Sequence, residues 1–239
     1  MTSRPTILVP LAVLEGESIP EGVPELLSGA QVLLLGYHEL PEQTAAEQAS
    51  EQFEPKASDR LEQLAAMLRA AGSRVDTRLV FTHERQQTIN RVLVEEDCEA
   101  VPIPAAAPPI ARALVAVRGP ASLDRTVAVL AALFADAGTG ITLYHVLESA
   151  EAAEAVTATF EAYTEALIEA GIDPEAIETR TEEGERRLAA IERVGADYDA
   201  IVMGESDPSV ATYVFGLPED QLAEQFLGPV LVIQRPPPA

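Results

Sequence analysis

The sequence has almost no lysine: of its 16 basic residues, only Lys56 is a lysine. Against these stand 39 acidic residues, which gives a net charge of -23 at pH 7. A chain without a basic patch cannot replace the counterions of nucleic acid, so we expect no nucleic-acid binding. Repulsion among the carboxylates opposes the compact state until salt screens it, with a Debye length of about 3 Å at 1 M.

Cysteine and long hydrophobic runs are also scarce. Cys98 is the single cysteine, which excludes a disulfide framework and a thiolate metal cluster, and its acidic neighbours indicate an unreactive structural thiol. The apolar run 127–135 is far shorter than the ~20 residues of a membrane-spanning helix. The apolar N-terminal run contains Pro10 and lacks a cleavage site, so we expect a strand there and not a signal peptide. We therefore expect a cytoplasmic protein without membrane insertion.

What the sequence does contain is a pattern that occurs twice. Tyr37-His38 follows one apolar run, and Tyr144-His145 follows another run 107 positions later. DCEAVPIP and DYDAIVMG are 100 positions apart, at Asp97 and Asp197. Apolar strands that alternate with helices predict parallel strands joined by right-handed crossovers, in a sheet covered on both faces. The predicted fold class is therefore α/β, with an open, mostly parallel five-stranded sheet in each of two tandem domains.

The first of these domains is abbreviated. After the strand AVPIP comes AAAPPI, which cannot form a helix or a central strand, so the first half lacks its last helix and fifth strand. We place the domain boundary in this proline-rich stretch, which gives domains 1–108 and 109–239. Two helices are expected to begin at capping serines, Ser58 and Ser122. The acidic segment EQTAAEQASEQFEP before Ser58 is interpreted as a solvated surface helix or a flap over the sheet.

With these strands and the C-terminal GPVLVIQ, the chain resembles the universal stress protein family in a tandem form. The likeness covers nearly all of 113–235 and, more weakly, 5–104. Its most specific parts are GPVLVIQ and the spacing from Gly216 to Pro229. The resemblance implies the strand order 3-2-1-4-5 in each domain and a histidine that closes the second strand, as His145 does. The acidic, lysine-poor composition resembles that of proteins from salt-loving archaea, and an ordinary acidic protein is the alternative.

Nucleotide-binding members of that family carry a glycine loop, G-x2-G-x9-G-[S/T], whose backbone N–H groups wrap the phosphates. In the stretch GESDPSVATYVFGLPEDQ, Gly204 fits the first glycine and Gly216 fits the third, with an interval one residue short. Asp207 stands at the second glycine and Leu217 at the hydroxyl position. The first half has no such loop.

A second departure lies at the end of the first strand, where the family has an aspartate that contacts the nucleoside. Arg118 matches this position in the second half and Ala12 in the first. The candidate cofactor-binding residues are Gly204, Ser206, Gly216 and Arg118, a remnant of a nucleotide site.

These departures set the expected function. We expect a non-enzymatic universal-stress-type protein that acts through contacts with an unidentified protein partner in stress response or regulation, and that needs no cofactor. The alternative is a regulatory module that binds ATP or AMP at a divergent site, with Arg118 as a compensating cation. An enzyme of the related adenine-nucleotide superfamily is a third hypothesis. It would need an activating lysine or paired acid and base residues, and the sequence indicates none.

The other reactive residues have structural interpretations. His38 and His145 occupy equivalent positions, but no further ligands recur at usable spacing, so a hydrogen-bonded structural role is favoured over a metal site. His83 lies at a strand-to-helix turn, where capping or exposure is expected. Ser206 and Ser209 lack a G-x-S-x-G setting for nucleophilic catalysis.

The last strand predicts how the protein assembles. Pro229–Gln234 is apolar and uncharged, and the implied strand order places it at a sheet edge. It either pairs with the same strand of a second chain or lies against the first half of its own chain. We expect the homodimer, because a symmetric edge contact satisfies both copies at once.

Overall fold

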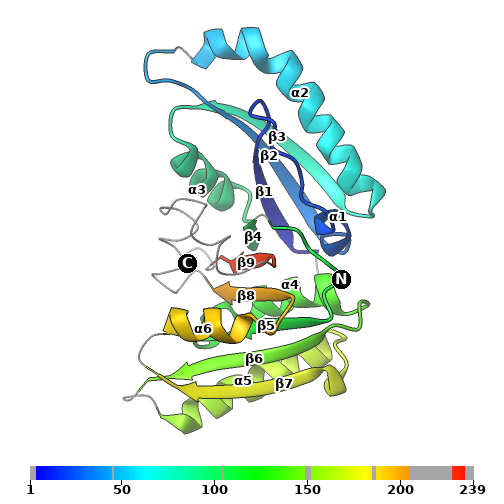
Figure 1. Ribbon diagram of the computed structural model, residues 1–239, viewed down its shortest axis with the longest axis vertical. Coiled ribbons are helices and arrows are strands. Elements are labelled where there is room, and N and C mark those ends of the chain that lie inside the picture. The colour runs from blue at the N-terminus through cyan, green and yellow to red at the C-terminus, as the bar shows by residue number, and fades with distance from the viewer. Residues whose placement is uncertain are drawn as a thin grey trace.

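The structure is a computed structural model that describes residues 4–44, 46–103, 105–148, 152–184, 187–204 and 228–234. These residues form one continuous twisted sheet with helices on both of its faces (Figure 1). The first half of the chain builds one end of the sheet and the second half builds the other end.

The described residues contain nine strands in the order β3-β2-β1-β4-β9-β8-β5-β6-β7. Every neighbouring pair is parallel except β4 and β9, which are antiparallel. The predicted open, mostly parallel α/β sheet is therefore confirmed. The strands are β1 (Thr6–Ala12), β2 (Gln31–Glu39), β3 (Arg74–Thr82), β4 (Ala100–Ile103), β5 (Arg112–Ala116), β6 (Gly140–Leu147), β7 (Ile177–Glu183), β8 (Ala200–Gly204) and β9 (Val230–Ile233).

Alternation along the strands sends neighbouring side chains to opposite faces of the sheet. On one face, Ile7 and Val115 belong to a single core that runs through both halves under α1, α2, α4 and α5. On the other face, Leu8 packs under α3 and Leu114 packs under α6, in two separate clusters. The helices are α1 (Val23–Leu26), α2 (Ala46–Ala70), α3 (Arg85–Glu95), α4 (Leu123–Phe134), α5 (Ala153–Glu169) and α6 (Arg187–Gly195).

Strand β9 joins the two halves. On one side it pairs in parallel with β8, and on the other side it pairs antiparallel with β4, with Ala100 opposite Ile233 and Ile103 opposite Val230. The predicted homodimer through Pro229–Gln234 is wrong in this respect, because both edges of the strand are already paired within the chain. The first half ends its own sheet at β4, and β9 takes the place that its fifth strand would have filled.

A helix contact reinforces this junction. Arg125 of α4 donates a hydrogen bond from Nη1 to the carbonyl of Cys98, at 3.1 Å, and forms an ion pair with Asp97. The backbone N–H of Gln234 donates to the carbonyl of Glu99, at 2.8 Å. The second half is thus attached to the start of β4 from both the sheet and a helix.

Helix α2 corrects one expectation from the sequence. It runs unbroken from Ala46 to Ala70, so Ser58 lies in its interior and does not cap it, and Pro55 lies inside the helix. Burial of an apolar stripe that includes Ala57, Leu61 and Leu68 holds the helix together across the hydrogen bond lost at the proline. At α4, Ser122 does occupy the N-cap position, but its side chain makes no capping hydrogen bond.

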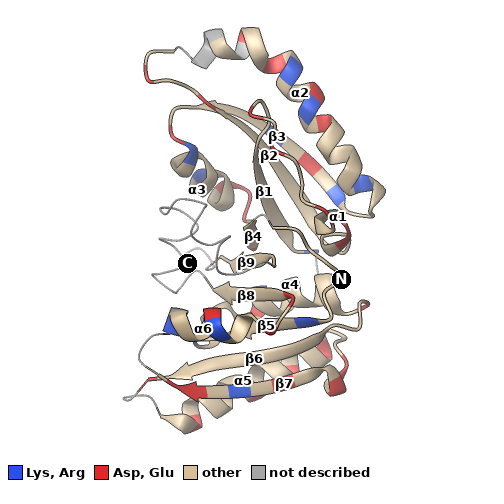
Figure 2. Cartoon of the chain, viewed as in Figure 1, with Lys and Arg blue, Asp and Glu red and all other residues tan. Residues whose placement is uncertain are grey.

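Acidic residues are spread over both halves of the molecule and are not gathered in one patch (Figure 2). The basic residues fall between them on helices such as α2 and α6 (Figure 2). Among the residues that the structure describes, no helix has both the length and the apolar character to cross a membrane.

Candidate functional site

The strand order reverses between the neighbouring strands β5 and β8: the strand that follows β5 in the sequence, β6, lies on one side of this pair, and the strand that follows β8, β9, lies on the other side. Helix α4, which follows β5, packs on the same face as α5, and α6, which precedes β8, packs on the other face. In open α/β sheets ligands bind beyond the carboxyl ends of the strands at such a point. A cavity of about 360 Å³ lies here, which falls at the lower end of the range for small-molecule sites.

One side of this cavity carries hydroxyl groups from the two helices beneath the sheet. The Tyr163 hydroxyl donates to the carbonyl of Gly119, at 3.3 Å, and Ser122 and Thr126 lie beside it in the lining. Burial raises the pKa of Tyr163, and its hydrogen bonds with Ser122 and Thr126 lower the pKa in part. The phenol is therefore protonated at neutral pH and serves as a neutral hydrogen-bonding group.

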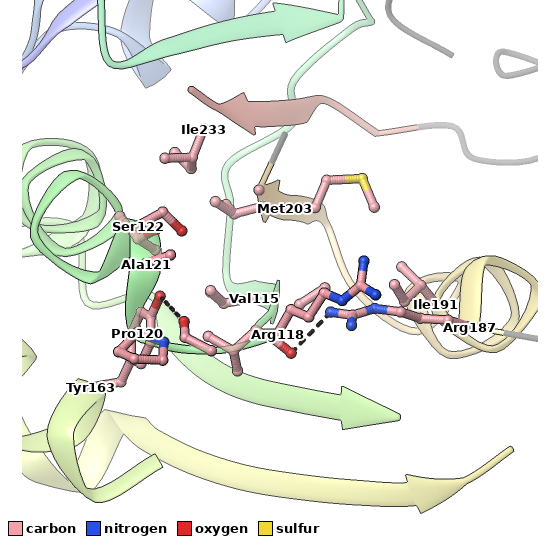
Figure 3. Close-up of a pocket in the computed structure, with 16 residues that line it drawn as sticks. Val115, Arg118, Pro120, Ala121, Ser122, Tyr163, Arg187, Ile191, Met203 and Ile233 are labelled. Atoms are coloured by element: carbon pink, nitrogen blue, oxygen red, sulfur yellow. Dashed lines mark hydrogen bonds between the residues drawn. The ribbon is translucent and has the colours of Figure 1, made fainter. Parts of the chain in front are cut away.

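The opposite side carries two arginines (Figure 3). Arg118 lies two residues beyond the end of β5, and Arg187 is the first residue of α6, so two elements distant in sequence bring these guanidinium groups to one cavity. Arg187 donates from Nη2 to the carbonyl of Val117, at 3.0 Å. Among the described lining residues, these arginines are the only charged ones. A planar guanidinium presents paired donors that match a phosphate or carboxylate group.

His145 fixes the backbone from which Arg118 extends. The imidazole is 3% exposed, and its Nδ1 lies 2.8 Å from the carbonyl of Val117, so Nδ1 carries the donated proton. Its ring packs edge-on against Phe160, with centroids 6.5 Å apart. The structure confirms the hydrogen-bonded role that the sequence favoured for this histidine. Because Val117 accepts from both β6 and α6, the end of β5 is held between these two elements.

The corresponding place in the first half is built differently. The N–H of Val13 donates to the carbonyl of Tyr37, and the N–H of Val117 donates to the carbonyl of Tyr144, so Val13 and Val117 are equivalent. The counterpart of Arg118 is therefore Leu14. The sequence alignment, which placed Ala12 there, was wrong. The Ala12 N–H is taken by the carboxylate of Glu17, at 2.6 Å. The chain's own acidic side chain therefore occupies the end of β1.

Two of the four nucleotide-site candidates from the sequence lie at this cavity. Gly204, at the end of β8, and Arg118 line the same cavity, whereas Ser206 and Gly216 lie outside the described residues. Sequence reasoning missed Arg187. The signal that could have indicated it is Arg186-Arg187, the one Arg-Arg pair in a chain with 16 basic residues, placed at the start of an expected helix.

The remaining candidates show no reactive arrangement within the described part of the chain. The Nδ1 of His83 lies 3.2 Å from the carbonyl of Leu40, which ties the loop after β3 to the end of β2. His38 packs edge-on against Phe53 and Phe81. No group of three potential metal ligands occurs among the described residues. Ser209 lies outside them.

Sequence comparisons return no match: no protein-family model and no curated protein matches this chain. Structure comparisons do return matches. A universal stress protein from Archaeoglobus fulgidus DSM 4304 superposes with a TM-score of 0.60 and 17% identity, over 98% of this chain and 97% of that chain.

Two proteins of Pseudomonas aeruginosa are similar over comparable lengths. A functionally unknown protein of strain PAO1 has a TM-score of 0.51 and 18% identity, over 98% of this chain and 93% of that one. A putative universal stress protein of strain UCBPP-PA14 has a TM-score of 0.50 and 17% identity, with 98% and 94% covered. At such low identity the likeness concerns the fold, and the chain has the fold of these universal stress proteins over nearly its whole length.

Proposed function

We propose that this chain is a non-catalytic, tandem universal-stress-type regulatory protein whose second half binds a small ligand with a phosphate or carboxylate group. An adenine nucleotide such as AMP or ATP is the first candidate for that ligand. The observation that carries the proposal is the convergence of Arg118 and Arg187 on a cavity at the switch point of the sheet. The sequence alone favoured a scaffold without a ligand, and Arg187 moves the preference to a binding function.

The charge of the lining supports an anionic ligand. The fold family's aspartate is replaced by Arg118, which reverses the charge at the end of the strand, and α6 adds a second guanidinium. A phosphate or carboxylate group that enters the cavity between these two guanidinium groups can accept charge-assisted hydrogen bonds from both. A phosphate would then be held by side chains where the glycine loop has lost its second glycine and its hydroxyl.

The same lining argues against catalysis. Within its described part the cavity offers two arginines and the hydroxyls of Ser122, Thr126 and Tyr163, and no carboxylate or imidazole. Arginine does not release its proton, and burial raises the pKa of Tyr163 further from neutrality. A general base near pH 7 is thus lacking among these residues, which is why the proposal is a binding function.

A pure protein-contact scaffold remains the second candidate. It is favoured by Asp207 and Leu217, which stand in the sequence where a phosphate loop would carry glycine and a hydroxyl. Under this hypothesis the arginine pair would serve only the packing of α6.

Calorimetry with AMP and ATP in 1 M potassium chloride separates the two candidates. We expect a dissociation constant between about 10 µM and 1 mM. Charge-assisted hydrogen bonds contribute about 1.5–3 kcal/mol each, and the loop lacks one glycine and one hydroxyl that would bind the phosphates. Arg118→Gln should weaken binding roughly tenfold. The matched control Arg74→Gln removes an exposed arginine on β3 and should leave the affinity unchanged.

Two further results decide the identity of the ligand. Mass spectrometry of small molecules released from the denatured protein reports what the cavity held in the cell. If neither nucleotide binds and no anionic molecule is released, the scaffold hypothesis is favoured.

A double variant tests the origin of the loop. If the loop descends from a nucleotide loop, Asp207→Gly combined with Leu217→Ser should raise the affinity for ATP.

A further inference from the structure

A second cavity lies at the junction of the two halves, away from the arginine site. It is formed by the crossover around α1, the proline-rich connection that leads into β5, and the C-terminal end of α4. Its volume is about 660 Å³, larger than that of the candidate site and well within the range for small-molecule sites. We call it the junction cavity.

The floor of the junction cavity is apolar. Leu133 and Phe134 of α4 form its base, with exposed fractions of 8% and 2%, and the half-buried Leu26 and Ile110 flank them. These four side chains come from three segments of the chain. The surface that they present is shaped for an aliphatic or aromatic group, because only such a group replaces water there without losing hydrogen bonds.

The walls are held in place by backbone contacts. The N–H of Ala107 donates to the carbonyl of Glu21, at 2.8 Å, and the hydroxyl of Thr139 donates to the carbonyl of Ile110, at 2.7 Å. Gly22 has a φ of +81°, and a Cβ there would lie 1.6 Å from the carbonyl oxygen of Ala107. The crossover and the connection therefore meet backbone to backbone, which only glycine permits. The cavity is preformed, so a ligand does not need to order its walls.

The charge of the rim selects the ligand. Glu21 and Glu25 are exposed at the mouth, and within the described lining they are the only charged residues. Two carboxylates beside an apolar floor attract a positive group and repel a carboxylate or phosphate. This is the reverse of the arginine site, so one chain carries two cavities of opposite charge.

We propose that the junction cavity binds a small lipophilic cation, meaning an ammonium or guanidinium group carried on an aliphatic or aromatic body. The body lies on Leu133 and Phe134, and the positive group lies at the rim beside Glu21 and Glu25. The ligand touches both halves of the chain, because α1 belongs to the first half and α4 to the second.

The test uses the full chain in 1 M potassium chloride, where non-specific attraction of cations to the acidic surface is screened. Hexyltrimethylammonium, 1-hexanol and hexanoate are titrated separately, and binding is followed by calorimetry and by NMR shifts. The expected order of affinity is cation, then alcohol, then anion. The double variant Glu21→Gln with Glu25→Gln should weaken the binding of the cation roughly threefold to tenfold, as expected for two exposed charge contacts. The affinity for 1-hexanol should not change.

Matched variants complete the design. Ala137→Trp fills the cavity from an exposed position and should abolish binding of both the cation and the alcohol. Glu175→Gln with Glu178→Gln removes two exposed charges elsewhere and should change nothing. Arg118→Gln should also leave cation binding unaltered, which separates this site from the proposed nucleotide site. Equal affinity for the cation and hexanoate, or cation binding that survives Ala137→Trp, overturns the proposal.

Discussion

Individual carboxylates in this protein do more than add negative charge: some accept hydrogen bonds from the backbone. Glu99 accepts the N–H of Thr6 at the start of β1, at 2.6 Å, and Asp199 accepts the N–H groups of Ala111 and Arg112 at the start of β5, at 2.9 and 2.8 Å. These side chains satisfy backbone N–H donors at the starts of the two strands. Burial raises the pKa of Glu99, so this carboxylate is held in place at a cost in desolvation.

The thiol of Cys98 should be inert in the folded protein. Burial, followed by the nearby charges of Glu99, Glu96 and Asp97, raises its pKa to about 12 from an ordinary 9.0. We expect negligible alkylation by iodoacetamide at pH 8 and rapid alkylation in urea, measured by mass spectrometry. The stability contribution of this thiol is complete below pH 9 and is lost as the pH rises towards 12, because only the unfolded state then releases the proton. Fast labelling of the native protein would contradict this burial.

Residues of the candidate site could be predicted from the sequence only where they adjoin a recognisable strand. Arg118 was found because it directly follows an apolar run. Arg187 was not, because its place beside Arg118 depends on how α6 packs, and sequence spacing carries no record of that packing. The assignment of Ala12 as the counterpart of Arg118 failed by two positions, since alignment of two short strands without a shared motif does not fix their register.

Among the elements, the strands were the most predictable and the helix limits the least. Continuous apolar runs locate β2, β6 and β8 within a few residues, because burial on both faces leaves no polar interruption. The start of α2 was misplaced since a serine and a proline imitate a helix boundary within a longer apolar stripe. Whether β9 would pair within the chain could not be deduced, because a second copy offers the same hydrogen bonds.

Strand β9 should be essential for folding of the chain as a whole. Leu231 and Ile233 are 0% and 1% exposed, so Leu231→Lys or Ile233→Lys buries an unpaired charge, which costs about 4 kcal/mol or more. We expect loss of the folded state by circular dichroism, and not conversion of a dimer to monomers. The control Thr179→Lys places the same side chain on the exposed edge strand β7 and should be tolerated. A folded monomeric Leu231→Lys variant would show that β9 is dispensable.

At the scale of the whole molecule, the two halves share one sheet and one continuous core. The core face beneath α2, α4 and α5 passes from Val9 to Val115 without a break, and β4 and β9 carry the sheet across the same line. The boundary that we placed at 108 on the sequence stays a prediction about domains. The structure adds that its two sides are joined by main-chain hydrogen bonds.

Stability should depend strongly on salt. With a net charge of -23 spread over both halves, self-repulsion opposes the folded state until counterions screen it. Between 0.1 and 2 M potassium chloride we expect the thermal midpoint to rise by roughly 5–15 °C, a change that corresponds to a few kcal/mol for a chain of this size. A midpoint that does not move with salt would count against this electrostatic account.

The antiparallel pairing of β4 with β9 also sets the order of events during synthesis on the ribosome. β4 ends at Ile103, and β9 begins only at Val230. Translation at about 5–20 residues per second leaves a gap of roughly 6–25 s between them. During that interval the nascent first half exposes the edge of β4 with no strand to receive it, and such an edge recruits neighbouring chains. The growing polypeptide is therefore most open to misassembly in the cell before its last strand emerges from the exit tunnel.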